Sequence, residues 1–183
     1  MYIVGVFENP DGKLGKMLAC RTSLYCRTVL IDSKNYPVCF NPEKSLKTVF
    51  VFSYSELFRF SELCCDILII NKRNDSGDIC TLKSKIAIAG NEELREFPIY
   101  SDEIITCGSS PRNTITLSSI AYGKATFAIQ REIVSLGGKI KSPHETEVSC
   151  DERSLPSVML TLAALCALDL PEKALLSKPP SYV

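Results

Sequence analysis

Residues 2–14 read YIVGVFENPDGKL, an apolar run followed by a polar turn and the start of a helix-forming segment. A strand, a turn containing Gly-Lys and then a helix is the context in which phosphate-binding loops occur. Backbone N–H groups at the helix N-terminus bind phosphate oxygens there, and the lysine neutralises charge. Gly12 and Lys13 match the Gly-Lys pair of the general pattern GxxxxGK[ST] and are the candidate phosphate-binding residues. No catalytic or metal-ligating residue is predicted beside them.

The rest of this loop departs from the pattern. Phe7 stands at the first glycine position, where its ring is expected to crowd the loop, and Leu14 replaces the hydroxyl that would bind magnesium. Pro10 lacks an N–H, while Glu8 and Asp11 add negative charge where phosphate would lie. Two interpretations stay open. The segment is a plain Asn-Pro-Asp-Gly tight turn, which these residues alone favour, or it is an eroded phosphate loop.

The two carboxylates can also reach the free N–H groups at the start of the helix. Asp11 is well placed to cap the helix, and either carboxylate would fill the site from within. The alternative is weak, metal-free capture of phosphate, sulfate or a partner's carboxylate by Gly12 and Lys13. Internal capping is the favoured interpretation.

The first 107 residues alternate short apolar runs with polar or helix-forming connections. The runs are mostly continuous in Val, Ile and Phe, which is typical of strands covered on both faces. Strands are predicted over residues 2–7, 28–31, 48–52, 66–70, 85–89 and 103–107. Helices are predicted over 13–25 and over 53–61, the latter with Ser53 as N-cap and Glu56 completing a capping box. Strands separated by helices predict a mainly parallel sheet.

The pattern changes after Gly108. Residues 114–121 and 124–133 are β-prone and meet at Tyr122-Gly123, which predicts an antiparallel hairpin, and a third β-prone segment lies around 145–150. An apolar helix is predicted over 155–168 with Ser154 as its cap, and a short second helix from Pro171. We therefore expect a single α/β domain over residues 1–176: a parallel part (1–107), a hairpin excursion (108–150) and a helical end (151–176). Residues 177–183 are expected to be a flexible tail.

Composition excludes several classes of function. Lys and Arg number 21, as do Asp and Glu, so no net charge attracts nucleic acid or an anionic membrane. The N-terminus has no basic leader, and apolar stretches such as 155–170 are too short to span a bilayer. The nine cysteines show no CxxC pair and no zinc spacing, which indicates free thiols in a reducing compartment. A cytoplasmic protein is expected.

Later segments, taken in order, resemble the central ATP-binding domain of the Mur-type amide ligases, the superfamily of peptidoglycan and folylpolyglutamate ligases. Residues 104–111 (IITCGSSP) are similar to the family's strand ending in a "TYG-S" turn, and residues 160–170 (LTLAALCALDL) to its Ala/Leu-rich helix. Residues 65–75 (CDILIINKRND) resemble "DIAVLTNIGEDH", and residues 85–92 (KIAIAGNE) fall where the family has "VLNADDP". The loop at Gly12 and Lys13 then lies where its GTNGKT loop belongs. The resemblance implies a phosphate-loop-like fold and a vestigial nucleotide site.

Departures from the family decide the expected function. Only Gly-Lys survives of the loop, Arg153-Ser154 replaces a nucleotide-contacting "HN", and residue 76, directly after Asp75, is not a histidine. The stretch with the magnesium-binding Glu and the two further domains of the ligases have no counterpart in this sequence. We expect a non-catalytic binding or regulatory module that needs no cofactor, retains at most weak ATP, ADP or phosphate binding, and acts with a protein partner such as an intact cell-wall ligase. The alternatives are an amide ligase or ATPase completed by a partner chain, and a structural interaction protein without nucleotide binding.

Three other features have simpler interpretations. His144, the sole histidine, is expected as a solvated loop residue. Asp66, Asp75 and Asp78 form a carboxylate cluster at strand ends or, more simply, Asp75 and Asp78 lie in an exposed turn. The Ser109-Ser110 pair is favoured as a turn over an anion site.

Overall fold

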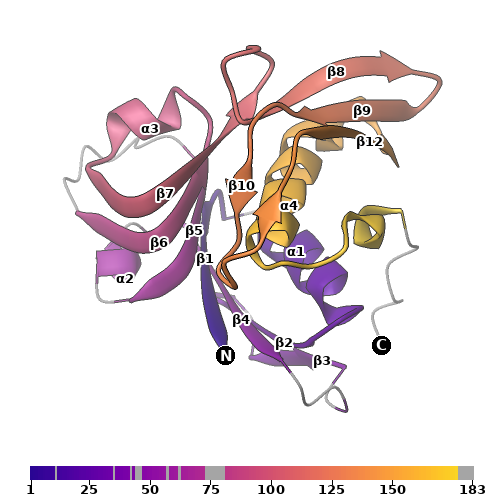
Figure 1. Ribbon diagram of the computed structural model, residues 1–183. Coiled ribbons are helices and arrows are strands. Elements are labelled where there is room, and N and C mark those ends of the chain that lie inside the picture. The colour runs from indigo at the N-terminus through magenta and orange to yellow at the C-terminus, as the bar shows by residue number, and fades with distance from the viewer. Residues whose placement is uncertain are drawn as a thin grey trace.

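The computed structural model describes residues 1–176 except 11, 35, 42, 44–46, 57, 62 and 73–80. The apolar runs form one ten-stranded sheet with the order β12-β9-β8-β7-β6-β5-β1-β4-β2-β3 (Figure 1). Neighbouring strands among β1, β2, β4, β5, β6 and β7 pair in parallel, which confirms the predicted parallel part. Their bounds are β1 Tyr2–Glu8, β2 Arg27–Asp32, β4 Thr48–Tyr54, β5 Cys65–Asn71, β6 Leu82–Ala89 and β7 Ile99–Gly108.

Antiparallel strands extend this sheet at both edges. β3 (Val38–Phe40) pairs with β2 at one edge and was not expected from the sequence. At the other edge, β8 (Ile115–Ala121), β9 (Lys124–Ile129) and β12 (His144–Ser149) form the predicted antiparallel part. The β8–β9 hairpin turns at Tyr122 and Gly123, whose φ angles are 51° and 74°. A separate two-stranded sheet pairs β10 (Ile133–Val134) with β11 (Ile140–Lys141).

The helices are α1 (Leu14–Ser23), α2 (Phe58–Ser61), α3 (Glu93–Glu96) and α4 (Leu155–Ala167), with 3-10 turns η1 (Glu152–Ser154) and η2 (Glu172–Leu175). α1, α4 and η2 occupy predicted positions. The helix predicted over 53–61 is wrong at its start, because Ser53 belongs to β4 and its Oγ donates to Glu8 instead of capping a helix. Ser154 precedes α4 as predicted, but its side chain does not cap it. The Ser154 Oγ donates to the carbonyl of Asp151, because η1 already uses this turn.

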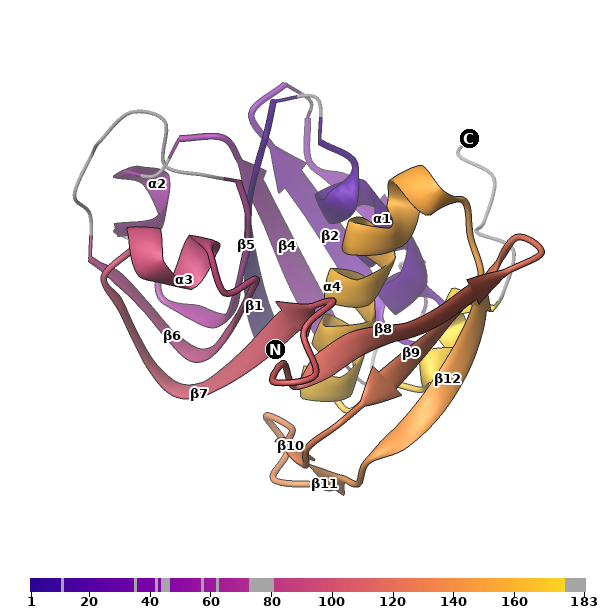
Figure 2. The ribbon, with the colours of Figure 1, turned by 90° about the horizontal axis from the view of Figure 1, so that it is seen from above.

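Two apolar clusters lie on the two faces of the sheet. Every residue from Val158 to Ala167 of α4 is buried, Leu162, Leu165 and Cys166 among them. α1 and α4 lie side by side between the parallel strands and the β8–β9–β12 extension (Figures 1 and 2). The smaller cluster, on the α2 and α3 side, contains Phe7, Phe60 and Phe97. No helix among the described residues is long and apolar enough to cross a membrane. The division at residues 107 and 150 and the tail at 177–183 stay predictions.

Candidate functional site: the loop after β1

The loop after β1 lies at the centre of the parallel sheet. β1 pairs with β4 on one side and β5 on the other, and α1 begins at Leu14. Ligands of open parallel sheets bind at the carboxyl ends of the strands, which is where this loop lies. The Gly12 N–H donates to the Asn9 carbonyl at 2.7 Å, so the tight turn predicted from Asn-Pro-Asp-Gly is formed. The tight turn therefore forms the loop that connects β1 to α1.

The carboxylate of Glu8 occupies the start of α1. Its Oε2 accepts a hydrogen bond from the Leu14 N–H at 2.9 Å, and its Oε1 accepts one from the Gly15 N–H at 2.8 Å. The Ser53 hydroxyl, from the end of β4, also donates to Oε1 at 2.7 Å. Glu8 is only 3% exposed. Free N–H groups at a helix N-terminus attract anions, and here the anion is an internal side chain.

Gly12 leaves room for this carboxylate. A Cβ added at Gly12 would overlap the Glu8 Oε2 atom, so any other residue there would push against the buried carboxylate. The remaining hollow beside the loop measures about 40 Å³ and is lined in part by Gly12, Lys16 and Ser53. Pockets for small ligands span roughly 300–1,000 Å³. This hollow is too small for a nucleotide phosphate chain, and Glu8 already occupies the Leu14 and Gly15 N–H groups.

Lys13, the second candidate residue, lies at the N-cap position of α1 with an exposed side chain. That side chain makes no ion pair or hydrogen bond with any described residue. It borders a cavity of about 720 Å³ between α1 and the start of α4, which Asp151 and Arg153 also line. Phosphate binding by Gly12 and Lys13 stays a prediction. Asp11, expected as a helix cap, lies outside the described residues, and Glu8 makes the internal contacts that are seen.

The two residues that depart most from the phosphate-loop pattern both belong to the core. Leu14 is fully buried in the larger apolar cluster, so no side-chain oxygen stands at the magnesium position. Phe7 does not crowd the loop, contrary to our expectation. Its ring packs edge-on against Phe60 and Phe97, with centroid separations of 6.0 and 5.6 Å, because consecutive strand residues face opposite sides of the sheet. Within the described part of the chain, no three His, Cys, Asp or Glu side chains form a metal site.

The sequence predicted His144 as a loop residue, and this is wrong. His144 is the first residue of β12. Its Nε2 lies 2.7 Å from Glu172 Oε2, and Lys141 Nζ lies 3.2 Å from Glu172 Oε1. The hydrogen bond to Glu172 raises the pKa of His144, and the hydrogen bond to the Ser142 carbonyl adds to this. Burial opposes ionisation of Glu172, but the bonds from His144 and Lys141 outweigh it and lower the Glu172 pKa. This pair of an exposed His144 and a half-buried Glu172 joins β12 to η2.

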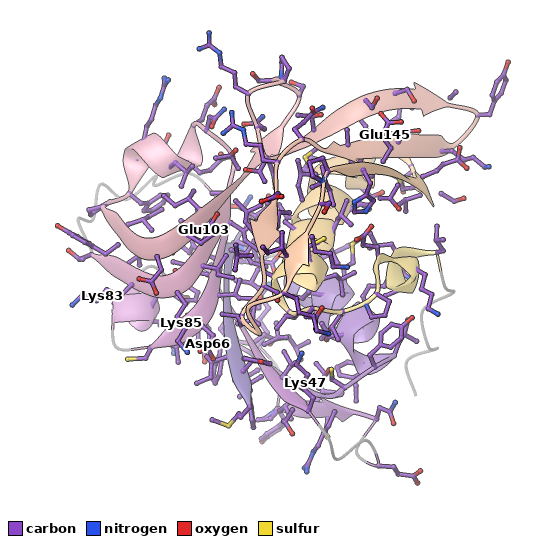
Figure 3. All side chains as sticks on the ribbon, viewed as in Figure 1. Lys47, Asp66, Lys83, Lys85, Glu103 and Glu145 are labelled. Atoms are coloured by element: carbon purple, nitrogen blue, oxygen red, sulfur yellow. The ribbon has the colours of Figure 1, made fainter. Side chains whose placement is uncertain are left out.

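Asp66 does not contribute to a carboxylate cluster at the carboxyl ends of the strands. It lies at the start of β5, where its Oδ2 accepts from the Ile3 N–H at 2.9 Å and its Oδ1 pairs with Lys85 Nζ at 2.7 Å. Figure 3 shows Asp66 and Lys85 together near the amino ends of β5 and β6. Asp75 and Asp78 lie outside the described residues. Asp66, the one described residue of the predicted carboxylate cluster, is therefore not part of such a cluster.

Sequence reasoning missed Ser53 as a partner of Glu8. The sequence indicated this contact only weakly, through a serine directly after the strand predicted over 48–52. The sequence pattern favours that serine as the N-cap of a helix instead. Strand pairing supplies the contact, because β1 and β4 are parallel neighbours with Val6 opposite Ser53. The ends of both strands thus meet beside α1.

No protein-family model and no curated protein matches this chain. Among solved structures, it is similar to a murein peptide ligase from Psychrobacter arcticus, with a TM-score of 0.57 and 9% identity over 95% of this chain and 45% of that one. It is also similar to a UDP-N-acetylmuramoyl-L-alanyl-D-glutamate–2,6-diaminopimelate ligase, with a TM-score of 0.60 and 12% identity over 96% of this chain and 45% of that one. The chain thus spans less than half the length of either ligase. At this identity the likeness concerns the fold: this chain has the α/β fold of part of a Mur-type ligase.

Proposed function

We propose that this chain is a non-catalytic Mur-ligase-like protein, a binding or regulatory module that acts in the cytoplasm beside an active ligase of cell-wall metabolism. One observation carries the proposal. The buried Glu8 carboxylate holds the Leu14 and Gly15 N–H groups, at the helix end where a phosphate loop would hold phosphate. The likeness to cell-wall ligases supports the setting, because it extends over nearly all of this chain.

An incoming phosphate would have to displace Glu8. Hydrogen bonds to a charged group contribute about 1.5–3 kcal/mol each, and Glu8 accepts three of them. A phosphate that approached without displacing Glu8 would meet a like charge in a site with little water to screen it. Nucleotide binding at this loop is therefore disfavoured by the chain's own side chain.

Phosphoryl transfer needs positioned charge around the phosphate and its metal ion. The position that would bind magnesium is Leu14, which is fully buried among apolar side chains. We expect the purified chain to hydrolyse no ATP above background. Steady turnover that disappears in Lys13→Ala would contradict this.

Calorimetric titration with ATP and ADP, with and without magnesium, tests the proposal directly. The wild-type chain is expected to bind neither nucleotide tightly, and magnesium is expected to make no difference. Magnesium-dependent tight binding would refute the proposal and support a ligase or ATPase completed by a partner chain. Glu8→Gln, which removes the internal negative charge, is titrated beside the wild type. Glu147→Gln, at an exposed carboxylate on β12 far from the loop in sequence, is its matched control.

The regulatory part of the proposal has its own test. An intact cell-wall ligase is assayed for amide-bond formation with and without an excess of this chain. A changed ligase rate is expected with the wild-type chain. An unchanged rate, together with no association in sedimentation, would refute the proposed setting.

A further inference from the structure

Another cavity of small-molecule size lies away from the loop after β1. It measures about 530 Å³, within the range of small-molecule sites. The ends of β5, β6 and β7 form one side, and β8 and the first turns of α4 form the other. No described residue of the loop at Gly12 lines it. The cavity is thus a site separate from the one that Glu8 fills.

Amide side chains from three consecutive strand ends meet in this cavity. Asn71 is the last residue of β5, Asn91 follows β6 and Asn113 lies after β7. Asn113 is only 2% exposed, and its Oδ1 accepts a hydrogen bond from Asn91 Nδ2 at 2.7 Å. Its Nδ2 makes no hydrogen bond with any described residue. This N–H pair is therefore available to donate to a ligand that enters the cavity.

The absence of a side chain at Gly108 leaves room for the Asn113 amide. Gly108 has a φ of 155°, and a Cβ added there would lie 2.6 Å from Asn113 Nδ2. A residue with a side chain would therefore strain the backbone and displace the buried amide. The Asn113 donor is consequently held at the cavity wall by the end of β7.

The charged side chains among the described lining residues are all acidic. Glu92, Glu93 and Glu152 contribute carboxylates, while no Lys, Arg or His is among the described lining residues. The side chain of Glu93 makes no ion pair or hydrogen bond with the described residues. Such a lining repels anions such as phosphate and attracts a cation. The opposite wall is apolar and includes Leu117, Leu155 and Met159.

We propose that this cavity binds a small primary amine that carries a neighbouring carbonyl group and an apolar side group. The ammonium pairs with Glu93, the carbonyl accepts from Asn113 Nδ2, and the apolar group packs against Leu155 and Met159. The three features of the lining thus match three features of one ligand.

The experiment uses the full chain and phenylalaninamide as the probe, followed by ligand-observed NMR. Two matched compounds separate charge from shape: N-acetylphenylalaninamide lacks the cationic amine, and phenylpropionate is an anion of similar size. Phenylalaninamide is expected to bind about tenfold more tightly than either, the ratio typical of one charge-assisted hydrogen bond. Equal binding of the three compounds, preference for the anion, or no binding of phenylalaninamide at millimolar concentration would overturn the proposal.

Variants place the probe in the cavity. Glu93→Gln keeps the size of the side chain and is expected to weaken phenylalaninamide binding about tenfold. Glu96→Gln, on the same helix but outside the lining, is expected to bind as the wild type does. Glu152→Gln, at an exposed lining residue, is the second variant if Glu93→Gln unfolds the chain. Wild-type binding in both lining variants would overturn the proposal, whatever the nucleotide titrations show, because Glu8 takes no part.

Discussion

Removing the Glu8 carboxylate should both destabilise the fold and open an anion site. In Glu8→Ala, the Leu14 and Gly15 N–H groups and the Ser53 hydroxyl lose their common acceptor. Loss of a helix cap costs roughly 0.5–2 kcal/mol, and each buried group left without a partner adds about 1–3 kcal/mol. Removing a buried charge offsets part of this, since its desolvation is no longer required. We expect a net loss of about 2–4 kcal/mol in the free energy of unfolding.

Urea unfolding followed by far-UV circular dichroism measures this loss, because the chain has no tryptophan for fluorescence. Phosphate or sulfate should then raise the stability of Glu8→Ala but not that of the wild type, since an anion that binds only the folded state stabilises it. Glu147→Ala is the control, because its pair with Lys124 is more than half exposed on both sides and exposed pairs contribute about 0–1 kcal/mol.

Two results would refute this account of Glu8. The first is a Glu8→Ala variant as stable as the Glu147→Ala control, which would mean that the carboxylate contributes nothing to the helix end. The second is a wild-type chain that phosphate stabilises as much as it does Glu8→Ala. The N–H groups would then be open to anions with Glu8 present.

Two further predictions concern the core and the β12–η2 contact. Leu165→Ala should lower the free energy of unfolding by about 2–5 kcal/mol, because Leu165 is fully buried in α4, and a change within the error of urea unfolding would place that face in solvent. Glu172 raises the pKa of His144 above its unfolded value of 6.5. The contribution of this pair to the free energy of unfolding should therefore be fully present below pH 6.5 and lost as pH rises through the folded pKa. His144→Ala should flatten the stability profile above pH 6.5, and an unchanged profile would show that the pair is not coupled to folding.

Most of the framework is predictable from local sequence patterns. The six parallel strands follow from continuous Val, Ile and Phe runs, which require cover on both faces. The burial of Leu162, Leu165 and Cys166 follows from a helix that is apolar all round, which only a core position allows. The hairpin follows from two β-prone runs around Tyr122-Gly123, since a left-handed turn there matches the twist of the strands. These properties depend on residues within a few positions of one another.

The partners of the polar side chains at these sites depend on contacts between distant segments. The sequence shows that Glu8 and Asp11 lie near the start of the helix, but it does not show which way either side chain points. The hydroxyl that completes the Glu8 contacts comes from Ser53, 45 positions away. His144 likewise pairs with Glu172, 28 positions away, whereas the sequence predicted a solvated loop residue without a partner. The cavity gathers Asn71, Asn91 and Asn113 only because β5, β6 and β7 are parallel neighbours whose ends lie at one edge. Local pattern predicts which segments form strands and helices, whereas the partner of a polar side chain depends on which segments the sheet brings together.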